Sequence, residues 1–179
     1  MDDIDPVQSA HLAPGGPALA AGAWFSAIVD HSDLSAAWRL TDRPLRVALV
    51  QSWMIATGLD DTPARQSVAD AIADNVGHAR WSAFAEWRLR RWRENTFKSF
   101  VADGWGLVSV PELVGPDLEF VRVAPGREGR ELSADDPIFV QTLTVRFVEG
   151  VWLVAGIGRS LPNPGWPPYE TSLRFEDMP

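Results

Sequence analysis

The chain has 179 residues, a length that suits one domain, and it has no cysteine, so disulfides, thiolate metal sites and thiol nucleophiles are excluded. Its net charge of −8 argues against binding to nucleic acids, whose phosphate backbones attract Lys and Arg. We therefore expect a single-domain protein that binds no nucleic acid.

Residues 1–15 are mostly polar or small, and they predict a flexible tail before the folded domain. Three of the first five residues are aspartates, whereas a secretory signal begins with basic residues and continues with an apolar run. The most apolar stretch, residues 45–59, is interrupted by Arg46 and Gln51 and is too short and too polar to span a bilayer. We expect a cytoplasmic protein that does not bind membranes.

Apolar residues at helical spacing predict a helix-rich N-terminal half. Four helices are expected to begin at Pro17, Leu34, Pro44 and Pro63, and a fifth covers residues 79–100. Proline suits a first helical turn because the backbone N–H that it lacks would have no partner there. Glycines follow the third and fourth helices, at Gly58 and Gly77, where they favour helix termination.

The fifth helix has the clearest period in the chain. One apolar face is expected to contain Trp81, Phe84, Ala85, Leu89, Trp92 and Thr96. Arg88 falls within this stripe, so its charged end either reaches solvent at the edge or meets a buried partner. Together with Arg90, Arg91 and Arg93 it forms a basic cluster, which is either a solvated helix face or a site for an anion or a partner.

After Gly104 the period changes from helix to strand. The expected strands are residues 105–110, 118–123, 138–148 and 151–157, with a polar loop at residues 127–137. Residues 161–179 are rich in proline, which cannot donate hydrogen bonds to a sheet, and they predict an extended C-terminal arm. Residues 16–160 are then the single folded domain.

The last two strands form a hairpin whose register follows from its turn. If Glu149 and Gly150 are the two turn residues, Phe147 lies opposite Trp152. One face is then Phe139, Gln141, Leu143, Val145, Phe147, Trp152 and Val154, which we expect the helices to cover. Gln141 is its one polar residue, and a buried amide needs either a backbone partner or a ligand. Neither strand contains an aspartate or a glutamate.

Three stretches together follow the layout of a known superfamily. They are residues 23–29 with Trp24, residues 33–41 with Trp38, and the hairpin at residues 145–154. Helices followed by a curved antiparallel sheet with a Trp-containing hairpin resemble the nuclear-transport-factor-2-like (SnoaL-like) superfamily, which has a cystatin-like α+β fold. The resemblance covers most of residues 17–160. It implies N-terminal helices packed on a curved antiparallel sheet, shaped as a cone with a pocket at its open end.

The resemblance also implies a choice of function classes. The superfamily contains steroid isomerases, dehydratases, polyketide cyclases and non-catalytic binding proteins, and many members form dimers through the sheet. The isomerase-like members use a carboxylate on the sheet, which is missing from the last hairpin here. The dehydratase-like members use histidine, aspartate and tyrosine, but the only tyrosine, Tyr169, lies in the arm.

Candidate catalytic groups are few. His31 lies between Asp30 and Asp33 at the end of the first helix, where it could be a general base or a simple turn residue. Asp30 or Asp42 would then supply the second acid–base group. The three histidines do not have the spacing of a metal site, and we find no phosphate-binding loop, so we expect neither a metal nor a cofactor.

These observations favour a non-catalytic domain that binds a small apolar ligand or serves in assembly. The expected pocket is lined by Trp24, Trp38, Trp81, Gln141 and Trp152, and the domain is expected to form a homodimer through its sheet. The alternative is a small lyase or isomerase that acts on an apolar carbonyl compound, with His31 and a nearby aspartate as acid and base.

Overall fold

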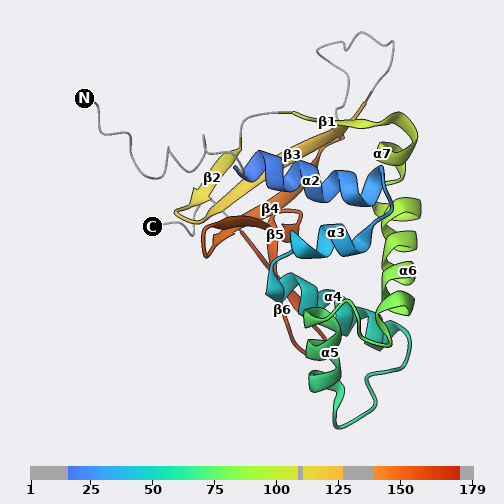
Figure 1. The fold of residues 1–179 in the computed structure, drawn as a ribbon. Coiled ribbons are helices and arrows are strands. Elements are labelled where there is room, and N and C mark those ends of the chain that lie inside the picture. The colour runs from blue at the N-terminus through green and yellow to red at the C-terminus, as the bar shows by residue number, and fades with distance from the viewer. Residues whose placement is uncertain (1–15, 109–110, 127–138, 174–179) are drawn as a thin grey trace.

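A computed structural model describes residues 16–108, 111–126 and 139–173. The predicted N-terminal tail, the loop at residues 127–137 and the end of the arm therefore lie outside the described residues. The fold is α+β, as expected from the sequence, with the N-terminal helices packed on a curved antiparallel sheet (Figure 1).

The described helical elements lie between Pro17 and Asp103. They are α2 (Pro17–Val29), α3 (Leu34–Arg39), α4 (Arg43–Ala56), α5 (Arg65–Asp74), α6 (Trp81–Arg91), η1 (Trp92–Thr96) and α7 (Lys98–Asp103). Proline occupies the first turn of α2 and of α4, as its missing N–H predicts. Asp33 caps α3, because its side chain accepts a hydrogen bond from the Ala36 backbone N–H.

The strands follow the helices along the chain. They are β1 (Trp105–Leu107), β2 (Glu112–Gly115), β3 (Leu118–Pro125), β4 (Gln141–Val148), β5 (Val151–Ile157), β6 (Ser160–Asn163) and β7 (Tyr169–Ser172). The main sheet has the order β1-β3-β4-β5. Strand β1 pairs with residues 123–125 of β3, and β2 pairs with residues 118–120 of the same strand. Strands β6 and β7 form a separate two-stranded sheet.

The predicted hairpin register is confirmed. Phe147 pairs with Trp152, and Val148 pairs with Val151. Glu149 and Gly150 have φ angles of 49° and 88°, which is the left-handed pair of residues that a two-residue hairpin turn requires.

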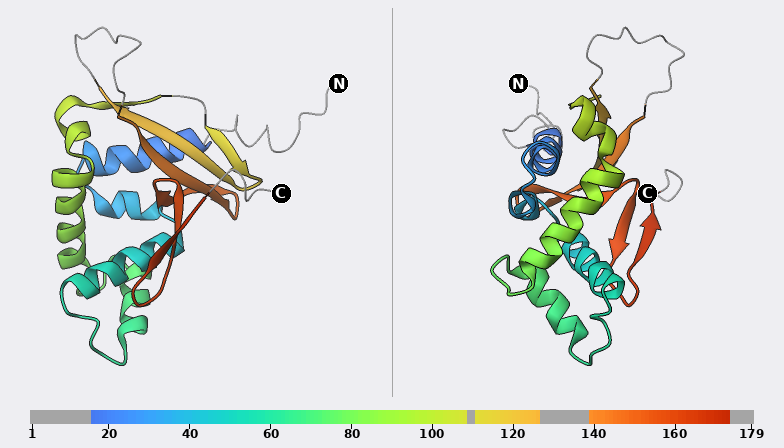
Figure 2. Two further views of the ribbon diagram at one scale, coloured as in Figure 1. Left: turned by 180° about the vertical axis from the view of Figure 1, so that it is seen from behind. Right: turned by 90° about the vertical axis from the view of Figure 1, so that its right-hand side faces the viewer.

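One face of the main sheet packs against α2, as Figures 1 and 2 show. The hairpin residues Leu143, Val145 and Val154 are fully buried on that face. The expectation that the helices cover the whole face is wrong at its two ends, because Phe139 is 57% exposed and Phe147 is 37% exposed. Phe139 precedes the start of β4, and Phe147 is the next-to-last residue of that strand.

Aromatic side chains fill the core between the helices and the sheet. Trp24 packs edge-on against Trp92, and Trp38 packs in the same way against Trp81 and Phe84. Edge-to-face packing places the positive ring edge against the negative ring face. The abundant tryptophans therefore build much of the core.

The expected helix at residues 79–100 is divided into three segments. Its middle segment, η1, is a π-helix, in which the Phe97 N–H donates to the Trp92 carbonyl oxygen at 2.6 Å. One extra residue in this turn changes the phase of the buried face, so Phe97 is buried and Thr96 is exposed. The expectation that Thr96 belongs to the apolar face is therefore wrong.

The described part of the C-terminal arm forms the hairpin β6–β7, which lies against α4 (Figure 2). Gln51 is fully buried on α4 and accepts a hydrogen bond from the Gly165 N–H at 2.9 Å. Its amide nitrogen donates to Gln66, which also accepts from the Trp166 indole. Two glutamines therefore attach the arm to α4 and α5.

Candidate binding site

Of the five residues predicted to line a pocket, the four tryptophans are buried in the core, where Trp38 packs against Trp81, and Gln141 is half-buried. Trp24 donates to the Thr41 hydroxyl at 2.9 Å, and Trp38 donates to the Ala73 carbonyl oxygen at 2.8 Å. Trp81 and Trp152 are also buried, and Gln141 donates to the Thr142 carbonyl oxygen, which is the backbone alternative for this amide. None of the five lines either of the two pockets described below.

The structure does not bring the three candidate catalytic residues together. Asp30 and His31 are exposed at the end of α2, where Asp30 accepts from Ser26 and from the Trp105 indole. Asp42 is buried at the other end of α3, a six-residue helix of about 9 Å. Its carboxylate oxygen lies 2.7 Å from a guanidinium nitrogen of Arg146. An ion pair thus already engages the one buried carboxylate of the three.

A larger hollow lies at the end of the sheet where β3 finishes and β4 begins. Its volume is about 570 Å³, and it is lined by Asn95, Thr96, Lys98, Ser99, Ala102, Asp103, Pro125 and Phe139. We call it the η1–α7 pocket. Val123 pairs with Gln141, so Pro125 and Phe139 lie at the same end of the sheet; one wall therefore comes from the sheet and the other from the helical segment.

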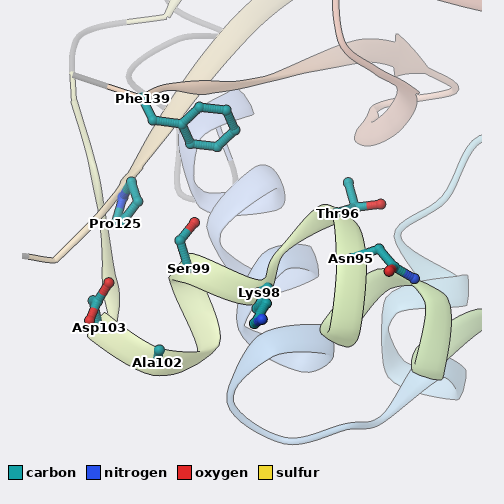
Figure 3. A pocket seen from close by; sticks show the side chains of 8 residues that line it. All are labelled: Asn95, Thr96, Lys98, Ser99, Ala102, Asp103, Pro125 and Phe139. Carbon is teal, nitrogen blue, oxygen red and sulfur yellow. The ribbon is translucent and has the colours of Figure 1, made fainter. Parts of the chain in front are cut away.

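The side chains of this pocket form two distinct surfaces, as Figure 3 shows. Ser99 points from the helical segment toward the ring of Phe139, which projects from the sheet side, whereas the Thr96 hydroxyl points away from that ring. The Phe139 ring packs against the Phe100 ring, with the ring centroids 5.8 Å apart. The pocket therefore offers an aromatic face opposite the Ser99 hydroxyl group.

The π-helix is the reason that polar residues reach the pocket. Because η1 adds one residue to the turn, Trp92 and Phe97 both face the core, and Asn95 and Thr96 are left on the outside. Single π-helical turns within α-helices occur often at functional sites. Lys98 adds a cation to the rim, and Asp103 adds a carboxylate.

Sequence reasoning missed every residue of this pocket except Phe139 and Thr96, which it assigned to apolar faces. One signal was present: buried aromatics fall at positions 92, 97 and 100, and the five-residue step does not fit a regular helix. Such a step marks an inserted residue, and the residues before it are displaced outward.

The covered face of the sheet does contain a carboxylate, contrary to what the last hairpin alone indicated. Glu119 on β3 pairs directly with Val145, so the two side chains share the face that α2 covers. It is fully buried. Neither described pocket includes Glu119.

A second, smaller hollow of about 100 Å³ lies between α4 and the C-terminal hairpin. Leu45, Leu49 and Pro162 are among its lining residues. Its volume is below the roughly 300 Å³ at which ligand pockets usually begin, so it represents imperfect packing of the arm.

Two further properties concern only the described residues. No group of three His, Asp or Glu side chains there could hold a metal ion, and no helix there has the length and apolarity needed to cross a membrane.

No family model matches the chain, and the searches of curated proteins and of solved structures gave no match. The superfamily resemblance thus stays an expectation from the sequence.

Proposed function

We propose that this protein is a non-catalytic binding domain and that the η1–α7 pocket holds a small, largely apolar ligand. The observation that carries the proposal is the hollow of about 570 Å³ between an exposed phenylalanine ring and a π-helical turn. This volume lies within the roughly 300–1,000 Å³ typical of small-molecule sites. Phe139 supplies an apolar stacking surface, and Ser99 supplies a hydrogen bond that would orient the ligand.

The arrangement favours binding over catalysis. Lys98 and Asp103 are the two charged residues of the pocket, and both lie on the short helix α7. General acid–base catalysts usually lie in a buried or paired environment, whereas both of these side chains are exposed to solvent.

The enzymatic alternative, a lyase or isomerase, has one observation in its favour, which is the buried Glu119 on the covered face. A substrate would need a path to this carboxylate, and neither described pocket leads to it. His31 and Asp42 lie at opposite ends of α3, so they do not form an acid–base pair. The binding proposal therefore has the stronger support.

The proposal is tested by filling the pocket. Ala102 lines it and is exposed, so Ala102→Trp should occupy the hollow without disturbing the core. The fluorescent probe anilinonaphthalene sulfonate, an apolar aromatic body with one anionic sulfonate, is expected to bind the unaltered protein at one saturable site and to bind the variant at least about tenfold more weakly. Val101→Trp is the matched control, because Val101 is the neighbouring exposed residue outside the pocket. Equal binding by all three proteins would contradict the proposal.

A further inference from the structure

Arg88 is a buried cation that forms no salt bridge with any carboxylate in the part of the chain that the structure describes. It lies in the middle of the buried stripe of α6, and only 9% of the residue is exposed. One guanidinium nitrogen, Nη2, donates to the Leu49 carbonyl oxygen of α4 at 3.2 Å. Among the residues that the structure describes, none forms a salt bridge with Arg88, and its buried Nε has no hydrogen-bond partner.

Two tryptophans and a second arginine surround this cation. The guanidinium carbon of Arg88 lies 4.7 Å from the centroid of the Trp87 ring and 5.3 Å from that of Trp92. The guanidinium carbon of Arg91 lies 5.0 Å from the same Trp87 ring. We call Trp87, Arg88 and Arg91 the Arg–Trp cluster. Arg91 is exposed and Trp87 is half-buried, so the cluster extends from the core to the surface.

The cluster is unfavourable for an isolated protein. Burial, with a smaller effect from the positive charge of Arg91, lowers the pKa of Arg88 to about 9. Partial compensation comes from the aromatic faces and from one carbonyl oxygen, but a buried charge is usually paired with an opposite charge. Two neighbouring guanidiniums that share one ring lack the anion that would relieve their mutual repulsion.

The surroundings indicate what kind of anion fits. The cluster is not part of either described pocket, and its residues extend from the buried stripe of α6 to the helix surface. Tryptophan and arginine are the residue types most enriched at the centres of protein–protein interfaces. The planar guanidinium matches the two oxygens of a carboxylate. A chain with a net charge of −8 concentrates positive charge on this helix, which complements an acidic partner.

We propose that the Arg–Trp cluster is the docking site for an acidic segment of a partner protein, in which a glutamate or aspartate carboxylate pairs with Arg88 and Arg91. An apolar residue of the same segment would pack on the exposed part of Trp87. This role is independent of the η1–α7 pocket, so either proposal can fail while the other holds.

The test uses the full chain and a fluorescein-labelled decapeptide of alternating glutamate and leucine, with binding measured by fluorescence anisotropy. Arg91→Gln and Arg88→Met are each expected to weaken binding at least about tenfold. Arg90→Gln is the matched control, since Arg90 is on the same helix but pairs with the exposed Glu86. The corresponding glutamine–leucine peptide is expected not to bind.

Thermal unfolding separates this role from a structural one. Arg88→Met replaces a buried charge by an apolar chain of similar length, so the melting temperature is expected to rise or stay the same while peptide binding is lost. A lower melting temperature with unchanged binding would assign Arg88 to the fold and overturn the proposal. An equal loss in Arg90→Gln, no binding at millimolar peptide, or equally strong binding of a DNA oligonucleotide through the same arginines would also overturn it.

Discussion

At the scale of single residues, buried charge distinguishes two parts of the molecule. Asp42 and Arg146 join the start of α4 to β4 through a paired contact, whereas Arg88 joins α6 to α4 through one carbonyl oxygen. A paired buried charge supports the fold, because removing one member of the pair leaves the other charge buried without compensation. An unpaired buried charge costs stability, and this cost is the basis of the docking proposal.

Breaking the Asp42–Arg146 pair is expected to lower the free energy of unfolding. Asp42→Ala leaves the Arg146 guanidinium, which is about one quarter exposed, without its partner, and the expected cost is about 2–3 kcal/mol. Asp74→Ala is the control, because Asp74 pairs with Arg43 on the surface and should cost less than about 1 kcal/mol. Urea denaturation measures both values. Similar losses for the two variants would contradict a structural role for Asp42.

The cap of α3 gives a prediction that depends on pH. Hydrogen bonds from the Ala36 backbone N–H and the Ser35 hydroxyl lower the pKa of Asp33 below its ordinary value of 3.8. The stabilisation is therefore present above pH 3.8 and is lost as the pH falls through the lower folded-state pKa. Asp33→Ala is expected to cost about 1 kcal/mol at pH 7 and less in strong acid. Urea denaturation at pH 7 and pH 3 checks this, and exposed Asp61→Ala should show no such effect.

At the scale of elements, the sequence predicts regular segments well because their signals are local. Helical spacing identified α2 and α4, and alternation together with the Glu149-Gly150 turn identified the β4–β5 register. Insertions were missed because they depend on packing. One extra residue in η1 and one in β5, at Ala155, each reverse the exposure that a simple period predicts. The η1–α7 pocket begins at the first of these insertions, so it could not be derived from periodicity.

The insertion in β5 also determines how the C-terminal hairpin is attached. After the bulge, Gly156 lies opposite Thr144, and the Ser160 carbonyl oxygen at the start of β6 occupies the space that a Cβ on Gly156 would need. A methyl group at Gly156 would overlap this oxygen, which is backbone and cannot easily move. Gly156→Ala is expected to cost about 1–3 kcal/mol. The matched control is Gly106→Ala, where nothing lies within 4 Å of the new methyl group. Urea denaturation measures the free energy of unfolding of both variants. Equal stability of the two variants would contradict the predicted overlap at Gly156.

At the scale of the whole molecule, the tryptophans explain why the site could not be placed from composition. Nine tryptophans suggest a lined pocket as readily as a packed core. The helices surround Trp24 and Trp38 completely, and the indole N–H groups find their partners within the protein. Space for a ligand is then left at the rim, where the helical segment and the sheet diverge. Fold class is decided by the order of elements, but the position of a cavity depends on how side chains from distant segments fill the volume between them.

A homodimer through the sheet stays a prediction, and the outward face of the β4–β5 hairpin is where it applies. Val148, Val151 and Leu153 share the face opposite α2, and Val151 is 55% exposed. Burial of such a row between two copies would remove apolar surface from water. Light scattering coupled to size exclusion is expected to give twice the chain mass of 19.7 kDa. Val151→Lys is expected to shift the protein toward the monomer, because the like charges would face each other across the two-fold axis. Leu19→Lys, at a more exposed position on α2, is the control and should leave the mass unchanged. A monomer at high concentration, or equal effects of the two lysines, would contradict dimerisation through this face.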